Sequence, residues 1–163
     1  MIGNVDVATL VAALENGVSR INPVTGVGTD GRFPQIAGFS FSYDRTAAAG
    51  SRLREIRLAD GTLVWRLGES TGFTGNFDIA TNSFLAGAGT PDGYNFGTAT
   101  RTTLSMGYAD ALIGFLTLEL AGNISAARYG QTEGRISVVP VPAAAWLFGG
   151  AMVSLMRMRR RAA

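Results

Sequence analysis

Apolar side chains recur at helical spacing between residues 6 and 18, and this period predicts an amphipathic helix. Asp6 is the type of residue that caps a helix N-terminus, and the Asn16-Gly17 pair is typical of a helix end. The side chains that share the predicted apolar face are Leu10, Val11, Leu14 and Val18.

A period of two residues predicts a strand in residues 32–43. Phe39, Phe41 and Tyr43 alternate with serines, so three aromatic side chains fall on one sheet face. Pro34 cannot donate a backbone hydrogen bond, which indicates either an edge strand or an interruption near its start.

Further strands are predicted beside tight turns. Residues 52–58 and 62–67 flank Ala59-Asp60-Gly61 and have the pattern of a β-hairpin. Two more strands are expected at residues 76–81 and 134–139.

A second helix is predicted over residues 108–120, ending near Gly122. The order helix, several antiparallel strands, helix and strand predicts an α+β domain, with helices packed on a mostly antiparallel sheet. The expected apolar face of the second helix consists of Leu112, Phe115, Leu116 and Leu120.

The distribution of charge separates the tail from the body of the chain. The 163 residues are 47% apolar and 16% charged, with a formal net charge of +2. Without four arginines near the C-terminus, ten basic residues remain against twelve acidic ones, so a nucleic-acid surface is not expected. These four are Arg157, Arg159, Arg160 and Arg161.

Two missing residue types exclude whole classes of chemistry. The chain has no cysteine, which excludes disulfides, thiolate nucleophiles, zinc fingers and iron-sulfur clusters. It has no histidine, so the imidazole base and the commonest metal ligand are missing too. Any catalysis by this chain alone would therefore rest on carboxylates, hydroxyl groups or arginine, and we assign no catalytic residue, no metal ligand and no cofactor to it.

Residues 138–156 form an uncharged stretch of 19 residues before the terminal arginines. As a helix this stretch would measure about 28 Å, close to the roughly 30 Å of bilayer hydrocarbon. The positive-inside tendency would keep the arginines cytoplasmic and the body outside the cytoplasm. The alternative is a buried core helix with a basic tip, although the stretch has no polar face.

The same stretch contains Val139, Pro140, Val141, Pro142 and Ala143. Together with the apolar stretch and the arginines, these residues resemble the PEP-CTERM class of sorting signals in its VPLPA variant, with Val141 where that variant usually has Leu. The resemblance implies recognition by an exosortase-type transpeptidase at the inner membrane, and a destination in a Gram-negative cell envelope.

The first 16 residues do not match a secretory signal, because they lack a basic start and a sufficient apolar run. Either the chain is tail-anchored from the cytoplasm, or it is the end of a longer exported protein. We favour the second interpretation, which places the body in the periplasm or outside the cell.

The glycine-rich loop at residues 81–94 contains the best candidate site. Phe84 offers a flat face for stacking, and Asp92 offers two acceptors that suit paired hydroxyl groups. The alternative is an ordinary loop in which Phe84 is a buried anchor and Asp92-Gly93 forms a turn.

Leu14-Glu15-Asn16-Gly17 is followed in order by further motifs at residues 31–44, 50–52, 79–94, 108–112 and 134–136. In this order the motifs resemble the C-terminal domain of the 5′-nucleotidase family, over about residues 5–138. The resemblance implies that this domain holds the nucleoside part of a substrate, while an upstream two-metal domain hydrolyses nucleotides, UDP-sugars or related phosphoesters.

The family pattern N-x-F-L-A-x-G-G-D-G-Y matches Leu85, Ala86 and five residues with a binding role, which are Asn82, Phe84, Asp92, Gly93 and Tyr94. The resemblance implies substrate-binding roles for these five residues, with Phe84 stacking on the base and Asp92 binding the ribose hydroxyls. The chain departs from the pattern in its spacer, which is two residues longer. The family's second aromatic and its phosphate-binding arginine would lie upstream of Leu14.

We therefore expect residues 1–137 to be an N-terminally truncated nucleoside-binding domain, and residues 138–163 a sorting signal with a transmembrane helix. The expected partners are a nucleoside or nucleotide and an upstream metallophosphoesterase domain with a dinuclear divalent metal centre. A second hypothesis is a non-catalytic envelope or extracellular matrix protein that is sorted by the same signal.

Overall fold

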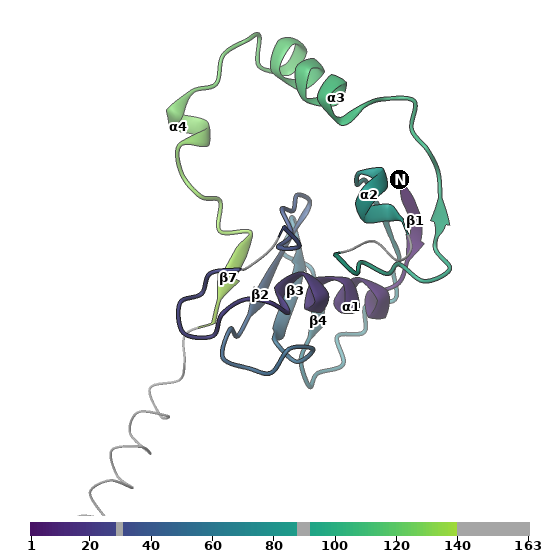
Figure 1. The fold of residues 1–163 in the computed structure, drawn as a ribbon, viewed down its shortest axis with the longest axis vertical. Coiled ribbons are helices and arrows are strands. Elements are labelled where there is room, and N and C mark those ends of the chain that lie inside the picture. The colour runs from purple at the N-terminus through teal and green to yellow at the C-terminus, as the bar shows by residue number, and fades with distance from the viewer. Residues whose placement is uncertain (29–30, 88–91, 140–163) are drawn as a thin grey trace, which may run out of the picture.

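The computed structural model describes residues 1–28, 31–87 and 92–139. The fold is α+β, with one three-stranded and one four-stranded sheet that are mostly antiparallel (Figure 1). The predicted fold class is confirmed at this level. The predicted transmembrane helix falls almost wholly on residues 140–163, which lie outside the described residues.

The three-stranded sheet has the N-terminal strand at its centre. Its order is β5 (Phe77–Ile79), β1 (Ile2–Val5) and β6 (Thr100–Arg101), and both pairs are antiparallel. The sequence pattern missed β1 because Ile2 and Val5 are three residues apart. An irregular register between them, with Asn4 at φ 62°, lets both side chains point into the core, where each is at most 1% exposed.

The four-stranded sheet contains the predicted hairpin. Its order is β4 (Leu63–Arg66), β3 (Leu53–Leu58), β2 (Phe39–Tyr43) and β7 (Ile136–Val138). The strand β7 is parallel to β2, whereas the other two pairs are antiparallel. The strand predicted over residues 32–43 begins only at Phe39, which agrees with the interruption expected at Pro34.

The first helix, α1 (Val7–Val18), confirms the predicted helix and its cap. The Asp6 carboxylate accepts a hydrogen bond from the Thr9 backbone N–H at 2.7 Å, and this bond lowers the pKa of Asp6. The helix lies against the four-stranded sheet and contacts β3 (Figure 1). Its core-facing side chains Leu10, Leu14 and Val18 are all buried.

One core joins α1 and both sheets. It forms because the apolar face of the helix and the alternating positions of the strands meet between them. Its buried side chains include Ile2, Val5, Leu10, Leu14, Val18, Phe41, Tyr43, Leu53, Ile56, Val64, Tyr94 and Phe96.

Residues 102–135 loop away from this core and return to it at β7 (Figure 1). The helix predicted over residues 108–120 is present as α3 (Tyr108–Gly114) and a π-helical turn, η1 (Phe115–Glu119), and a short helix α4 (Ala126–Tyr129) follows. The predicted apolar face of residues 108–120 does not pack on a sheet, since Leu112 is 56% and Phe115 is 43% exposed. The expectation that helices cover the sheet holds for α1 and is wrong for α3.

Candidate functional site

Several motifs that are far apart in the sequence meet at the C-terminal end of α1. The buried Glu15 carboxylate accepts backbone hydrogen bonds from Arg52 at 3.0 Å and from Leu53 at 2.7 Å. A carboxylate that accepts two N–H groups in a buried position holds both donors firmly. Glu15 thereby fixes the end of α1 to the start of β3.

The Arg52 side chain reinforces the same junction. It is buried, and its guanidinium group donates hydrogen bonds to the backbone oxygens of Val18 and of Ala47, the latter at 3.0 Å. The last carbonyls of a helix have no partner within the helix, and the guanidinium group supplies one for Val18. Arg52 thus shares the Val18 carbonyl with the Ile21 N–H, which donates at 3.3 Å, and the helix end is satisfied within the protein.

Asn16 connects α1 to the candidate loop. Its Nδ2 atom donates a hydrogen bond of 2.6 Å to the Asp92 backbone oxygen, and its Oδ1 accepts one of 3.4 Å from Arg32 Nη1. Gly93 follows with φ +70°, in the left-handed region that favours glycine. The chain is thus turned sharply at the point where Asn16 holds it.

Gly17 allows the closest approach in this junction. A methyl group added there would lie 2.7 Å from the Tyr94 hydroxyl oxygen and 2.8 Å from Cδ of Pro34. Tyr94 is buried, its ring stacks on Phe96, and its hydroxyl donates a 2.6 Å hydrogen bond to the Arg32 backbone oxygen. The structure therefore gives Tyr94 a packing role beside the loop.

The candidate stacking residue lies on α2 (Ser83–Ala86). The Asn82 side chain caps this turn by accepting a 2.8 Å hydrogen bond from the Leu85 N–H, and Arg101 Nε donates a 2.8 Å bond to the Ala86 carbonyl. Phe84 is 51% exposed, so the alternative of a buried anchor is wrong. A fixed turn therefore presents an aromatic face to solvent.

No hydrogen bond or ring contact links Phe84 to Asp92 within the described residues. The Asp92 residue is half-buried, and within the described ranges its carboxylate makes no hydrogen bond or ion pair. In the same ranges, no ring contact involves Phe84. Most of the spacer between them, residues 88–91, lies outside the described residues.

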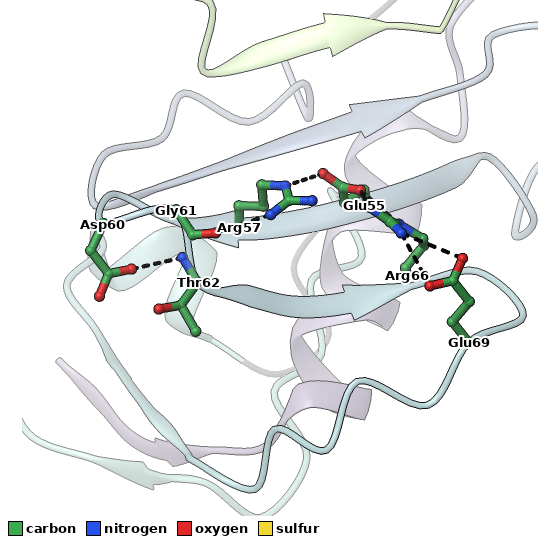
Figure 2. A network of polar contacts seen from close by, with 7 residues as sticks. All are labelled: Glu55, Arg57, Asp60, Gly61, Thr62, Arg66 and Glu69. Atoms are coloured by element: carbon green, nitrogen blue, oxygen red, sulfur yellow. Dashed lines mark hydrogen bonds and ion pairs between the residues drawn. The ribbon is translucent and has the colours of Figure 1, made fainter.

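A second group of polar side chains lies on the outer face of β3 and β4 (Figure 2). Glu55 pairs with Arg57 and with Arg66, whose Nε donates at 2.7 Å, and Arg66 also pairs with Glu69 at 3.1 Å. The hydrogen bond from Arg57, followed by that from Arg66, lowers the pKa of Glu55. Because each of these charges has a partner, this face is an ion-pair network rather than a site for a charged ligand.

No other candidate chemistry is found in the described part of the chain. No group of three or more acidic residues there could hold a metal ion. None of its helices has the length and hydropathy that a bilayer crossing requires.

Of the predicted sorting residues, Val139 continues the β7 pairing through a 2.9 Å hydrogen bond to the Tyr43 oxygen, while the rest lie beyond the described residues. The same is true of the four tail arginines.

No family model, curated protein or solved structure gives a significant match to this chain.

Proposed function

We propose that this chain is the nucleoside-binding C-terminal part of an exported 5′-nucleotidase-like phosphoester hydrolase. The observation that supports this proposal best is the junction at the end of α1. Glu15, Asn16 and Gly17 each make a specific contact, and these contacts tie together the motif segments near Arg52, Arg32 and Asp92. The motif segments are thus parts of one packed domain, as the proposal requires.

In this proposal the loop supplies two recognition elements. Phe84 presents its ring for stacking on a base, and the Asp92 carboxylate accepts hydrogen bonds from two ribose hydroxyls. Asn82 and Tyr94 act indirectly, by positioning the loop: the Asn82 Oδ1 caps α2, and the Tyr94 hydroxyl donates to the Arg32 backbone. The catalytic two-metal centre belongs to an upstream domain.

We also propose where in the cell the protein is located. The C-terminal segment acts as a PEP-CTERM-like signal: its apolar part enters the inner membrane, and an exosortase-type enzyme recognises Val139 to Ala143. The body then lies on the periplasmic or outer side, and the tail arginines stay in the cytoplasm.

Titration calorimetry with adenosine and uridine tests the nucleoside site. We expect binding by the wild-type chain that is weakened about 5- to 150-fold by Phe84→Ala, since stacking of one base is worth about 1–3 kcal/mol. Tyr108→Ala, which removes another exposed aromatic ring, is the matched control and should bind like wild type.

Asp92→Asn should also weaken binding, because one acceptor oxygen becomes a donor. Asp60→Asn, in an exposed turn where Asp60 bonds only its own loop at Thr62, serves as its control. If the wild-type chain binds neither nucleoside, the proposal fails and the non-catalytic envelope protein becomes the better account.

A further inference from the structure

The outward side of α1 borders an open groove of about 590 Å³ that the nucleoside proposal does not use. Ala8, Val11 and Ala12 line it from the helix, and Ala49 and Gly50 line it from the loop between β2 and β3. Because these side chains are small, bulky apolar groups can approach both the helix and the loop closely. The groove is therefore shaped for large apolar side chains.

The polar residues of the groove have their hydrogen bonds inside the protein. Glu15 accepts its two backbone bonds from β3, Asn16 holds the Asp92 carbonyl, and the Ser19 hydroxyl donates to the Asn16 backbone oxygen at 2.7 Å. A polar ligand would have to compete with these bonds. An apolar occupant would leave these three side-chain arrangements intact.

The direction of β7 brings the start of an apolar segment to the end of the sheet where the groove loop lies. The parallel pairing of β7 with β2 sets Val138 opposite Tyr43, and the Val139 N–H donates to the Tyr43 oxygen at 2.9 Å. The loop that contains Ala49 and Gly50 begins directly after Tyr43. Residues that follow Val139 thus leave the sheet at the end where this loop lies.

The segment that follows has the right composition and length for the groove. Residues 140–156 contain 17 residues without a charge, including the large neighbours Trp146, Leu147 and Phe148. As a helix the segment would measure about 26 Å, compared with about 18 Å for α1. It is long enough to cover α1 from end to end.

We propose that residues 140–156 dock into the α1 groove of the same molecule in water, and leave the groove when a bilayer is present. The groove covers one side of the segment, whereas lipid surrounds all of it. The bilayer therefore removes more of the apolar surface of the segment from water, and the segment moves there when a bilayer is available. Before sorting, the protein would thereby shield its own membrane segment. This inference rests on the proposed membrane segment but not on nucleoside binding.

Crosslinking of engineered cysteines in the full chain tests the docking. Because the chain has no cysteine, Ala12→Cys with Leu147→Cys creates a unique pair, which a short bis-maleimide can join. The control pair is Thr62→Cys with Leu147→Cys, since Thr62 lies in the exposed β3–β4 turn at the opposite end of the sheet. We expect monomeric crosslinking at least about fivefold faster for the groove pair, because docking raises its effective concentration.

Adding vesicles of phosphatidylethanolamine and phosphatidylglycerol should abolish the groove crosslink. Equal rates for the two pairs in water would overturn the proposal. So would crosslinks found only between two chains, which would assign the groove to a second copy, and so would a groove crosslink that vesicle-bound protein keeps.

A second measurement needs no crosslinker. In a Trp65→Phe background Trp146 is the remaining tryptophan, and docking predicts blue-shifted emission in water at concentrations where the chain is monomeric. Ala12→Glu, a change at an exposed helix position, should shift that emission to the red while the circular dichroism stays the same. An emission maximum that Ala12→Glu leaves in place would contradict docking on α1.

Discussion

Replacing Glu15 tests the junction on which the candidate site depends. In Glu15→Ala, the backbone N–H groups of Arg52 and Leu53 lose their shared acceptor while they stay buried against α1. In Glu15→Gln, one oxygen remains for one of these donors, but the other donor faces an NH2 group. The two variants therefore remove the interaction in steps.

The size of the effect follows from the cost of unsatisfied donors. A hydrogen bond to a charged group contributes about 1.5–3 kcal/mol, so losing two predicts a loss of about 3–6 kcal/mol for Glu15→Ala. Alanine gains a few tenths of a kcal/mol in helix propensity, which is too little to compensate. We expect about half of the loss for Glu15→Gln. Because domains of this size are stable by about 5–15 kcal/mol, both variants should still fold.

Urea unfolding at neutral pH, followed by circular dichroism, measures these differences. Glu69→Ala is the control, because Glu69 is half-exposed and pairs with Arg66 at the surface, where a change of at most about 0.5 kcal/mol is expected. A loss below about 1 kcal/mol for Glu15→Ala would contradict this role of the Glu15 carboxylate. It would mean that the two N–H groups reach water or another acceptor without Glu15.

Three further predictions concern neighbouring features of the same fold. Gly17→Ala should lower stability by about 1–3 kcal/mol through overpacking, whereas Gly114→Ala, in open space on α3, should leave thermal unfolding unchanged or slightly raised. Asn16→Ala should speed amide hydrogen exchange in residues 92–97 about five- to tenfold, as one hydrogen bond of the loop is lost; unchanged exchange there would contradict the tether. The pKa of Glu55 is lowered by its arginine partners, so its contribution is present at neutral pH and lost as the pH falls through that pKa. Glu55→Gln should therefore be less stable than wild type at pH 7 and equal to it at strongly acidic pH, and a stability difference independent of pH would argue against the ion pairs.

Local patterns in the sequence were sufficient for the elements that depend on local chemistry. The α1 helix was predicted with its cap because Asp6 and the apolar period both lie within the segment. The β3–β4 hairpin was predicted because its turn residues lie between two strand-like runs. Neither prediction required knowledge of a distant partner.

The features that depend on distant partners were not predictable in the same way. The strand β1 shows no alternation because the irregularity at Asn4 breaks it. The apolar face of α3 indicated burial, but a pattern of this kind does not say what covers the face. Glu15 and Gly17 stood out in the sequence only as part of a family-like motif and of a helix end, and only the fold shows that they meet Arg52 and Tyr94.

The exposure of Phe84 and the tether of Asp92 likewise depend on the tertiary structure. Asn16 lies 76 residues before Asp92 in the sequence, and no local rule connects an amide at a helix end to a loop carbonyl at that separation. Composition alone favoured a buried anchor for Phe84 over a stacking face, and the structure shows the ring exposed. The cap at Asn82 and the contact from Arg101 fix the turn that leaves its ring exposed.

The proposed nucleoside site requires Phe84 and Asp92 to bind the same ligand molecule. The most direct measurement is a two-dimensional NMR titration of the isotopically labelled chain with adenosine, which follows the amide signals of both residues together. We expect the amide signals of Phe84 and of Asp92-Gly93 to shift with adenosine concentration along one common binding curve. Shifts confined to one of the two places, or absent from both at millimolar adenosine, would contradict it.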